Sequence, residues 1–151
     1  MAPIRRAVPS EADALSDLAF RSKASWGYST DFMAACRDAL TIRSDAIAHD
    51  PVYVLENGGQ AVGFYHIVSA PPNGVLADLW IAPGSQRQGL GRRLFEHALK
   101  TAATSGYDEL IVESDPNAES FYLAMGARRV GANPSPMGGG RQLPVFTIRL
   151  R

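Results

Sequence analysis

The sequence predicts an α/β (α+β) fold in a single domain over residues 1–151, with a mixed central sheet and helices on its faces. The hydrophobic pattern alternates short apolar runs, typical of strands, with amphipathic stretches of helical spacing, in the order β-α-α-β-β-β-α-β-α-β-β. Turn sequences rich in Gly, Pro and Asn separate these runs. A chain of 151 residues is long enough for one hydrophobic core and too short to divide comfortably into two.

The N-terminal third of the chain is expected to form one strand and two helices. The strand covers Ile4–Ala7, and the first helix follows over about 11–23. Ser29 or Thr30 can cap a second helix that runs to about Ala48.

Two aromatic residues, Trp26 and Tyr28, lie in the Gly-containing turn between these helices. They either line a ligand pocket or pack between the helices as ordinary core aromatics, and packing is the more common role for such residues. Both alternatives stay open on the sequence alone.

Three strands follow in the middle of the chain. Val52–Leu55 and Ala61–Val68 flank Asn57-Gly58-Gly59, a strong hairpin signal. Val75–Ala82 is mostly apolar, as expected of a strand buried on both faces. The one charge inside it is Asp78. An acid there has either a structural partner or a raised pKa and a chemical role.

The stretch from Ile81 to Arg93 joins that third strand to a helix and has an unusual charge pattern. The helix is expected to begin near Gly89, and its basic start contains Arg87, Arg92 and Arg93 but no acid before Glu96. A helix N-terminus is positive, so cations there favour a bound anion that the backbone can approach closely through the glycines. The turn therefore predicts a cradle for a polyphosphate, with arginines as clamps. Its buried stripe comprises Leu90, Leu94, Ala98, Leu99 and Ala102.

Two common phosphate-binding turns are excluded by the residues present. The turn has no Gly-Lys-Ser/Thr and is therefore not a P-loop. A dinucleotide-binding fingerprint requires a third glycine three residues after the second, and that position is Leu94.

The C-terminal third is expected to contain three strands and one helix. A strand over Tyr107–Glu113 leads to a helix with Asp115 as N-cap and Pro at its first position, ended by Gly126. Strands over Arg128–Gly131 and Val145–Leu150 close the chain around a Pro- and Gly-rich loop.

Composition narrows the class of protein. Basic and acidic side chains are equal in number, so the formal net charge is zero, which disfavours duplex DNA or an anionic membrane as a partner. No signal peptide and no apolar stretch of bilayer-spanning length is visible. The single cysteine, Cys36, cannot form an internal disulfide, and no Cys/His cluster has metal-ligand spacing. We expect a cytoplasmic protein without nucleic-acid, membrane or metal partners.

Two segments resemble motifs of the GNAT superfamily of acyl-CoA-dependent N-acyltransferases. Q-R-Q-G-L-G, residues 86–91, is similar to the pyrophosphate-binding signature Gln/Arg-x-x-Gly-x-Gly/Ala. D-P-N-A-E-S-F-Y-L-A-M-G, residues 115–126, is similar to the later segment Asn-x-x-Ala-x-x-x-Tyr-x-x-x-Gly, except that Asp115 stands at the Asn position. The resemblance implies a mixed, mostly antiparallel central sheet flanked by helices, and an N-acetyltransferase with acetyl-CoA as acyl donor.

The resemblance also implies roles for individual residues. Tyr122 is the expected proton donor to the departing thiolate, and the alternative is that it is simply a core residue. Asp78 is the expected base for the amine, directly or through water, with His66 as the runner-up. His66 is otherwise a hydrogen-bonded structural residue. The residues expected to bind the cofactor are Leu79, Trp80, Ile81, Gln86, Arg87, Gln88, Gly89, Leu90, Gly91, Arg92 and, in place of the family's Asn, Asn117.

The acceptor is less defined than the donor. The family's acceptor side points to Trp26, Tyr28 and Arg141, although an exposed, solvated arginine is the plainer description of Arg141 beside a triple-Gly loop. The sequence leaves a small-molecule or peptide amine as acceptor, and a homodimer as possible. An alternative function is a sensor domain that binds CoA or a nucleotide without turnover.

Overall fold

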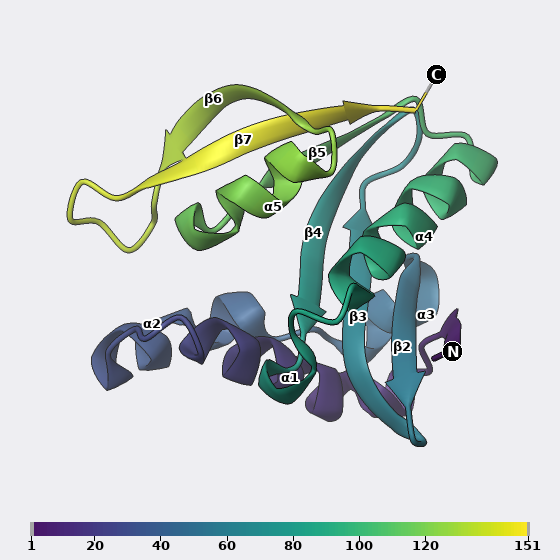
Figure 1. Cartoon of the computed structure of the whole chain (residues 1–151), viewed down its shortest axis with the longest axis horizontal. Helices are drawn as coiled ribbons and strands as arrows, with labels where there is room; N and C mark the ends of the chain where they lie inside the picture. The colour runs from purple at the N-terminus through teal and green to yellow at the C-terminus, as the bar shows by residue number, and fades with distance from the viewer. Residues whose placement is uncertain (1, 151) are drawn as a thin grey trace. The chain divides into compact units, whose positions relative to one another are not determined.

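The computed structural model describes residues 2–150 and has a mixed α/β fold (Figure 1). Its seven strands form a sheet in the order β1-β2-β3-β4-β5-β7-β6, with mostly antiparallel neighbours and helices beside the sheet. The predicted fold class is confirmed. The contacts divide the chain into two compact units. Unit 1 runs to Ile67 and resumes over Asp78–His97, and unit 2 comprises Val68–Ala77 and the chain from Ala98 onward.

Unit 1 contains a three-stranded antiparallel ladder. Arg5 pairs with Val54, and Val54 pairs with Phe64. The predicted hairpin turn is present, with φ of +61° at Gly58 and +79° at Gly59, values that L side chains rarely adopt. The strands are β1 (Ile4–Arg6), β2 (Val52–Asn57) and β3 (Gln60–Val68).

The helices of unit 1 include one more than the sequence predicts. The predicted second helix is interrupted at Thr41, which is extended, so two helices occupy its place. The hydroxyl of Ser16 accepts a hydrogen bond from the backbone N–H of Ile42 at 2.9 Å and holds the interruption against the first helix. Ser29 caps the second helix as predicted, accepting from the N–H of Phe32. The helices are α1 (Ala12–Ala24), α2 (Thr30–Leu40) and α3 (Ser44–His49).

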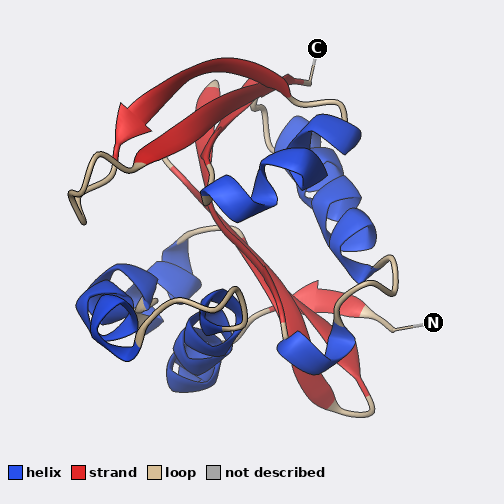
Figure 2. Cartoon of the chain, turned by 60° about the vertical axis from the view of Figure 1, so that its left-hand side comes forward, coloured by secondary structure: helices blue, strands red, loops and turns tan. Residues whose placement is uncertain are grey.

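The core of unit 1 lies between these helices and the sheet. Figure 2 shows α1, α2 and α3 grouped together beside the strands of this unit. Burying such apolar side chains stabilises the fold by about 1.5–3 kcal/mol for each large residue. Members of this core include Leu15, Leu18, Ala19, Met33, Cys36, Leu40, Ile47, Val52, Val54 and Phe64.

Strand β4 (Asn73–Ile81) and helix α4 (Leu90–Thr104) each contribute residues to both units. The prediction that β4 is buried on both faces is wrong, because Leu79–Ile81 is only half-buried. Gly63 of β3 lets the end of β4 approach closely, since a Cβ there would lie 2.7 Å from Cδ1 of Ile81. Helix α4 begins where predicted, and Leu94, Phe95, Ala98 and Ala102 are its buried residues in the middle turns.

Unit 2 is built on an antiparallel ladder and a short helix. Strand β5 (Glu109–Glu113) pairs in parallel with the start of β4 and antiparallel with β7 (Gln142–Arg149). Strand β6 (Arg128–Pro134) pairs with β7 and runs three residues further than predicted, because the hairpin pairs Pro134 with Gln142. A 3-10 turn, η3 (Pro116–Ala118), leads into α5 (Glu119–Ala124).

Candidate functional site

The turn before α4 has the backbone expected of an anion cradle. Gly89 has φ +76° and open space where a Cβ would stand, and Arg87 has φ +62°. The first turn of α4 contains no acid, and the first helical hydrogen bond runs from the N–H of Arg93 to Gly89. The first N–H groups of a helix have no acceptor within it, so this helix start can take an anion.

The side chains of the turn are arranged around that backbone. The amide of Gln86 donates to the carbonyl of Ile81 at 3.2 Å and braces the turn against the strand end. Arg92 is 59% exposed and 4.0 Å from Glu96, so its guanidinium remains accessible to a ligand. Gln88 and Arg93 also line a hollow of about 480 Å³, together with residues of the β2–β3 turn.

A group of polar side chains surrounds the buried His66 near the end of β4, within unit 1. The His66 ring stands between two carboxylates, with Nε2 2.8 Å from Asp50 Oδ2 and Nδ1 3.3 Å from Asp78 Oδ2. The indole N–H of Trp80 donates to Asp78 Oδ1 at 3.0 Å. Asp78 thus has structural partners, one of the two roles that the sequence leaves open.

The pKa of His66 is raised above its usual 6.5 by these surroundings. Burial alone disfavours the charged ring and lowers the pKa, but the hydrogen bonds and negative charges of Asp78 and Asp50 outweigh burial. A raised folded-state pKa means that the folded protein binds the proton more tightly than the unfolded chain does. The resulting stabilisation is fully present below about pH 6.5 and is lost as the pH rises through the folded-state pKa.

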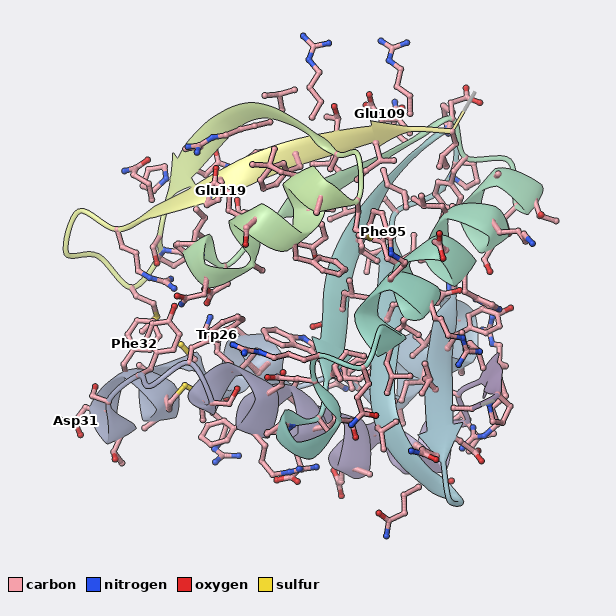
Figure 3. The ribbon with its side chains drawn as sticks, in the orientation of Figure 1. Trp26, Asp31, Phe32, Phe95, Glu109 and Glu119 are labelled. Atoms are coloured by element: carbon pink, nitrogen blue, oxygen red, sulfur yellow. The ribbon has the colours of Figure 1, made fainter. Side chains whose placement is uncertain are left out.

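The aromatic residues of the α1–α2 turn have two different environments. Tyr28 stacks on Phe32 with ring centroids 4.5 Å apart and packs against the core of unit 1, which agrees with the packing alternative. Trp26 is 46% exposed, so that alternative is wrong for Trp26. Figure 3 labels Trp26 in the α1–α2 turn and Phe32 in the first turn of α2. The ammonium of Lys23 lies 5.7 Å from the centre of the Tyr28 ring.

Asp115 begins the second motif segment, in unit 2, and organises the residues around it. Its Oδ1 accepts from the backbone N–H of Asn117 at 2.8 Å and from the Asn117 side-chain amide at 3.0 Å. The predicted N-cap role of Asp115 is thereby confirmed. Asn117, to which the cofactor contact was assigned, thus holds the turn together with Asp115.

Arg141 is ion-paired rather than solvated. Its guanidinium donates to Asp115 Oδ2 at 3.2 Å, and the two side chains are 18% and 7% exposed. The expectation of an exposed, solvated arginine is therefore wrong. The pair fastens the loop between β6 and β7 to the start of η3 within unit 2.

Tyr122 is buried in unit 2, with 6% of its surface exposed. Its ring lies 5.7 Å from that of Phe146 and edge-on to Phe121 at 5.2 Å. These contacts fix the ring, as a core residue and a catalytic hydroxyl both require, so the role of Tyr122 stays a prediction.

Two features are absent from residues 2–150. In that part of the chain no three side chains of the metal-binding types are grouped to hold an ion. None of the helices described there has the length and apolar character needed to cross a membrane.

A model of the acetyltransferase (GNAT) domain family matches residues 28–138. The chain therefore belongs to this family, and the resemblance found in its two motif segments is confirmed.

Individual relatives agree with this assignment. The chain is 28% identical over 150 residues to a 5-NmdU N-acetyltransferase of Pseudomonas phage PaMx11, covering 97% of this chain and 98% of the phage protein. Its fold is similar to that of the PaiA N-acetyltransferase of Thermoplasma acidophilum, solved with coenzyme A (TM-score 0.77, 15% identity, 99% of each chain). It is also similar to the ribosomal-protein-S18-alanine N-acetyltransferase of Escherichia coli (TM-score 0.74, 19% identity, 99% of this chain and 94% of that one).

Sequence reasoning missed Asp50 as a partner of His66. Asp50 follows α3 and stands two residues before Val52, which pairs with His66 across the β2–β3 ladder. Only the strand register brings the two together. The Asp78–Trp80 contact did have a signal, because residues two apart on a strand share a face.

Proposed function

We propose that this protein is an N-acetyltransferase that moves an acetyl group from acetyl-CoA to a primary amine. The observation that supports this most is the start of α4: a left-handed Gly89 with open space beside it, basic side chains, and no acid in the first turn, in a member of the acetyltransferase (GNAT) family. A polyphosphate fits such a helix start because the backbone N–H groups and the helix dipole both favour negative charge. The family match extends through both units, which supports one acetyltransferase domain over residues 1–151.

In this proposal the residues of unit 1 hold the donor. Backbone N–H groups over 87–92 bind the pyrophosphate, and the guanidinium of Arg92 adds charge-assisted hydrogen bonds. The backbone of Leu79, Trp80 and Ile81 aligns the pantetheine arm and stabilises negative charge as the thioester carbonyl is attacked. Acetyl-CoA supplies the activated acetyl group.

Proton transfer is assigned to two residues of the chain. The Asp78 carboxylate accepts a proton from the acceptor ammonium, directly or through water, so that a neutral amine attacks. Tyr122 donates its Oη proton to the departing sulfur, and it regains a proton from the attacking nitrogen, directly or through water, as the amide forms. The tyrosine role rests on the position of Tyr122 in the family motif and on a ring fixed by Phe146.

The acceptor is proposed to be a primary amine on a small molecule or peptide. One defined compound to test is 5-NmdU, which the phage relative acts on according to its name. The exposed Trp26 supports an acceptor side at the α1–α2 turn, because an exposed indole offers a flat apolar surface.

Isothermal titration with acetyl-CoA, followed by a thiol-release assay over a panel of amines that includes 5-NmdU, tests this proposal. We expect binding, and turnover with one acceptor class. Absence of acetyl-CoA binding would overturn the donor assignment. Binding without release of thiol on any amine would instead favour the sensor alternative.

A further inference from the structure

The arrangement around His66 differs from that of an isolated buried histidine. Both ring nitrogens face carboxylate oxygens, Nε2 toward Asp50 and Nδ1 toward Asp78. The His66 side chain is 9% exposed, Asp78 17% and Asp50 34%, so the group runs from the interior of unit 1 to its surface.

The number of N–H groups that the His66 ring needs indicates its charge. A neutral imidazole has one N–H and can donate to one carboxylate only, whereas an imidazolium donates from both nitrogens. The contacts at 2.8 Å to Asp50 and 3.3 Å to Asp78 can therefore both be hydrogen bonds to ionised carboxylates only when His66 is protonated. The raised pKa of His66 agrees with this count. Asp50 and Asp78 are the ionised groups that face the ring, and nearby Arg6 is bound to the Asp50 backbone carbonyl instead of its carboxylate.

The contacts of Asp78 indicate that the charged His66 ring holds the Asp78 carboxylate in place. Its Oδ2 faces His66 and its Oδ1 accepts from the Trp80 indole, so both oxygens are fixed. Each carboxylate oxygen can accept more than one hydrogen bond, so a further proton can still be taken up. A protonated His66 has no lone pair on its ring nitrogens, which excludes it as the base in this state.

We propose that His66 is a positioning residue for acetyl transfer: as an imidazolium it orients the Asp78 carboxylate toward the acceptor amine, while Asp50 balances its charge. This inference rests on the proposed function and deepens it, because it gives different roles to Asp78 and His66, the two side chains that the sequence left as candidates for the base. Asp78 remains the group that touches the proton, and His66 acts through it.

A double-mutant cycle tests this division of roles. We expect His66→Gln to lower kcat about 10-fold with the KM for acetyl-CoA changed less than about twofold, because orientation is lost and donor binding is not. In an Asp78→Asn background, His66→Gln should have no further effect on kcat. An additional 10-fold loss there, or an unchanged kcat in the single variant, overturns the inference. His49→Gln is the matched control, since His49 is exposed and bonded to a backbone carbonyl of its own helix.

A titration of the histidine ring nitrogens by NMR provides a readout that does not depend on turnover. The pKa of His66 should lie above the usual histidine value of 6.5 and should fall in Asp50→Asn, a variant that keeps the size of the side chain. A His66 pKa at or below 6.5 overturns the inference even if the enzyme is active. A wild-type chain that titrates as expected but binds no acetyl-CoA overturns the proposed function, and with it the positioning role of His66.

Discussion

The turn over 86–91 and the segment over 115–126 carry the two family motifs, and they keep their shape by different means. In the turn, left-handed backbone at Gly89 and Arg87 sets the path, and the Arg92 side chain is exposed. In the segment, side chains hold one another: Asp115 binds Asn117 and Arg141, and Tyr122 is buried against Phe146.

The difference shows what each motif specifies. A glycine in the left-handed region needs no partner side chain, so the first motif fixes local backbone and exposes N–H groups. The Asp115 carboxylate is nearly buried and needs matching donors, so the second motif depends on Arg141, 26 residues away in the chain. Substitutions in the two regions should therefore have different effects. Those in the 86–91 turn should weaken ligand binding, and those in the 115–126 segment should lower stability or slow the chemical step.

The largest effect is expected for Tyr122→Phe. Loss of the hydroxyl should lower kcat about 100-fold, as expected for a general acid, and leave acetyl-CoA affinity unchanged. The ring contact with Phe146 is kept, so the fold should persist. Steady-state kinetics with titration calorimetry measures both quantities.

Tyr107→Phe is the control for that change. It removes another buried tyrosine hydroxyl of unit 2, which donates to the carbonyl of Ser69. We expect lower stability and unchanged kcat. Equal kcat losses in the two variants would show that Tyr122 is a core residue only.

Gly89→Val should weaken acetyl-CoA binding about 30-fold, corresponding to about 2 kcal/mol lost at a helix start. The expected cause is that the substituted backbone leaves its left-handed conformation and turns its N–H groups away. Titration calorimetry provides the affinity. Gly59→Val is the control, because Gly59 has φ +79° and Gly89 has φ +76°, and both have open space where a Cβ would stand. This variant should bind acetyl-CoA with the affinity of the wild type. Similar losses of affinity in both variants would contradict a cradle at Gly89.

Asp115→Asn should lower the free energy of unfolding by about 1 to 2 kcal/mol, since it sets an amide N–H₂ against the nearly buried Arg141 donor. The remaining oxygen can still cap Asn117. Chemical denaturation provides the value. Arg129→Met breaks an exposed pair with Glu119 in the same unit and should cost less than about 1 kcal/mol. Equal losses of unfolding free energy in the two variants would mean that the Asp115–Arg141 pair contributes no more to stability than a surface ion pair does.

The smallest effect is expected for Arg92→Ala. Its long, weak pair with Glu96 is exposed, so stability should change by no more than about 0.5 kcal/mol. Acetyl-CoA affinity should fall about threefold at low salt, and the difference from wild type should shrink as salt screens the charge. An affinity loss that is independent of salt would argue against a phosphate contact by Arg92.

The strands and the turn before α4 could be predicted because their signals are local. Asn57-Gly58-Gly59 specifies its hairpin, and Gly89 ends the turn where the apolar stripe of α4 begins. The break at Thr41 could not be predicted, because Ser16 stabilises it from another helix. The extension of β6 to Pro134 could not be predicted either, because it depends on pairing with β7.

The sequence alone determined the fold class and the family and predicted an anion cradle at the start of α4, since periodicity, glycine positions and charge near a helix end act over a few residues. The tertiary structure decided which acids have partners. The β2–β3 register brought Asp50 to His66, and the β6–β7 hairpin brought Arg141 to Asp115. Charges in partly buried sites are set by neighbours distant in the chain, and those neighbours are known only once the strands are paired.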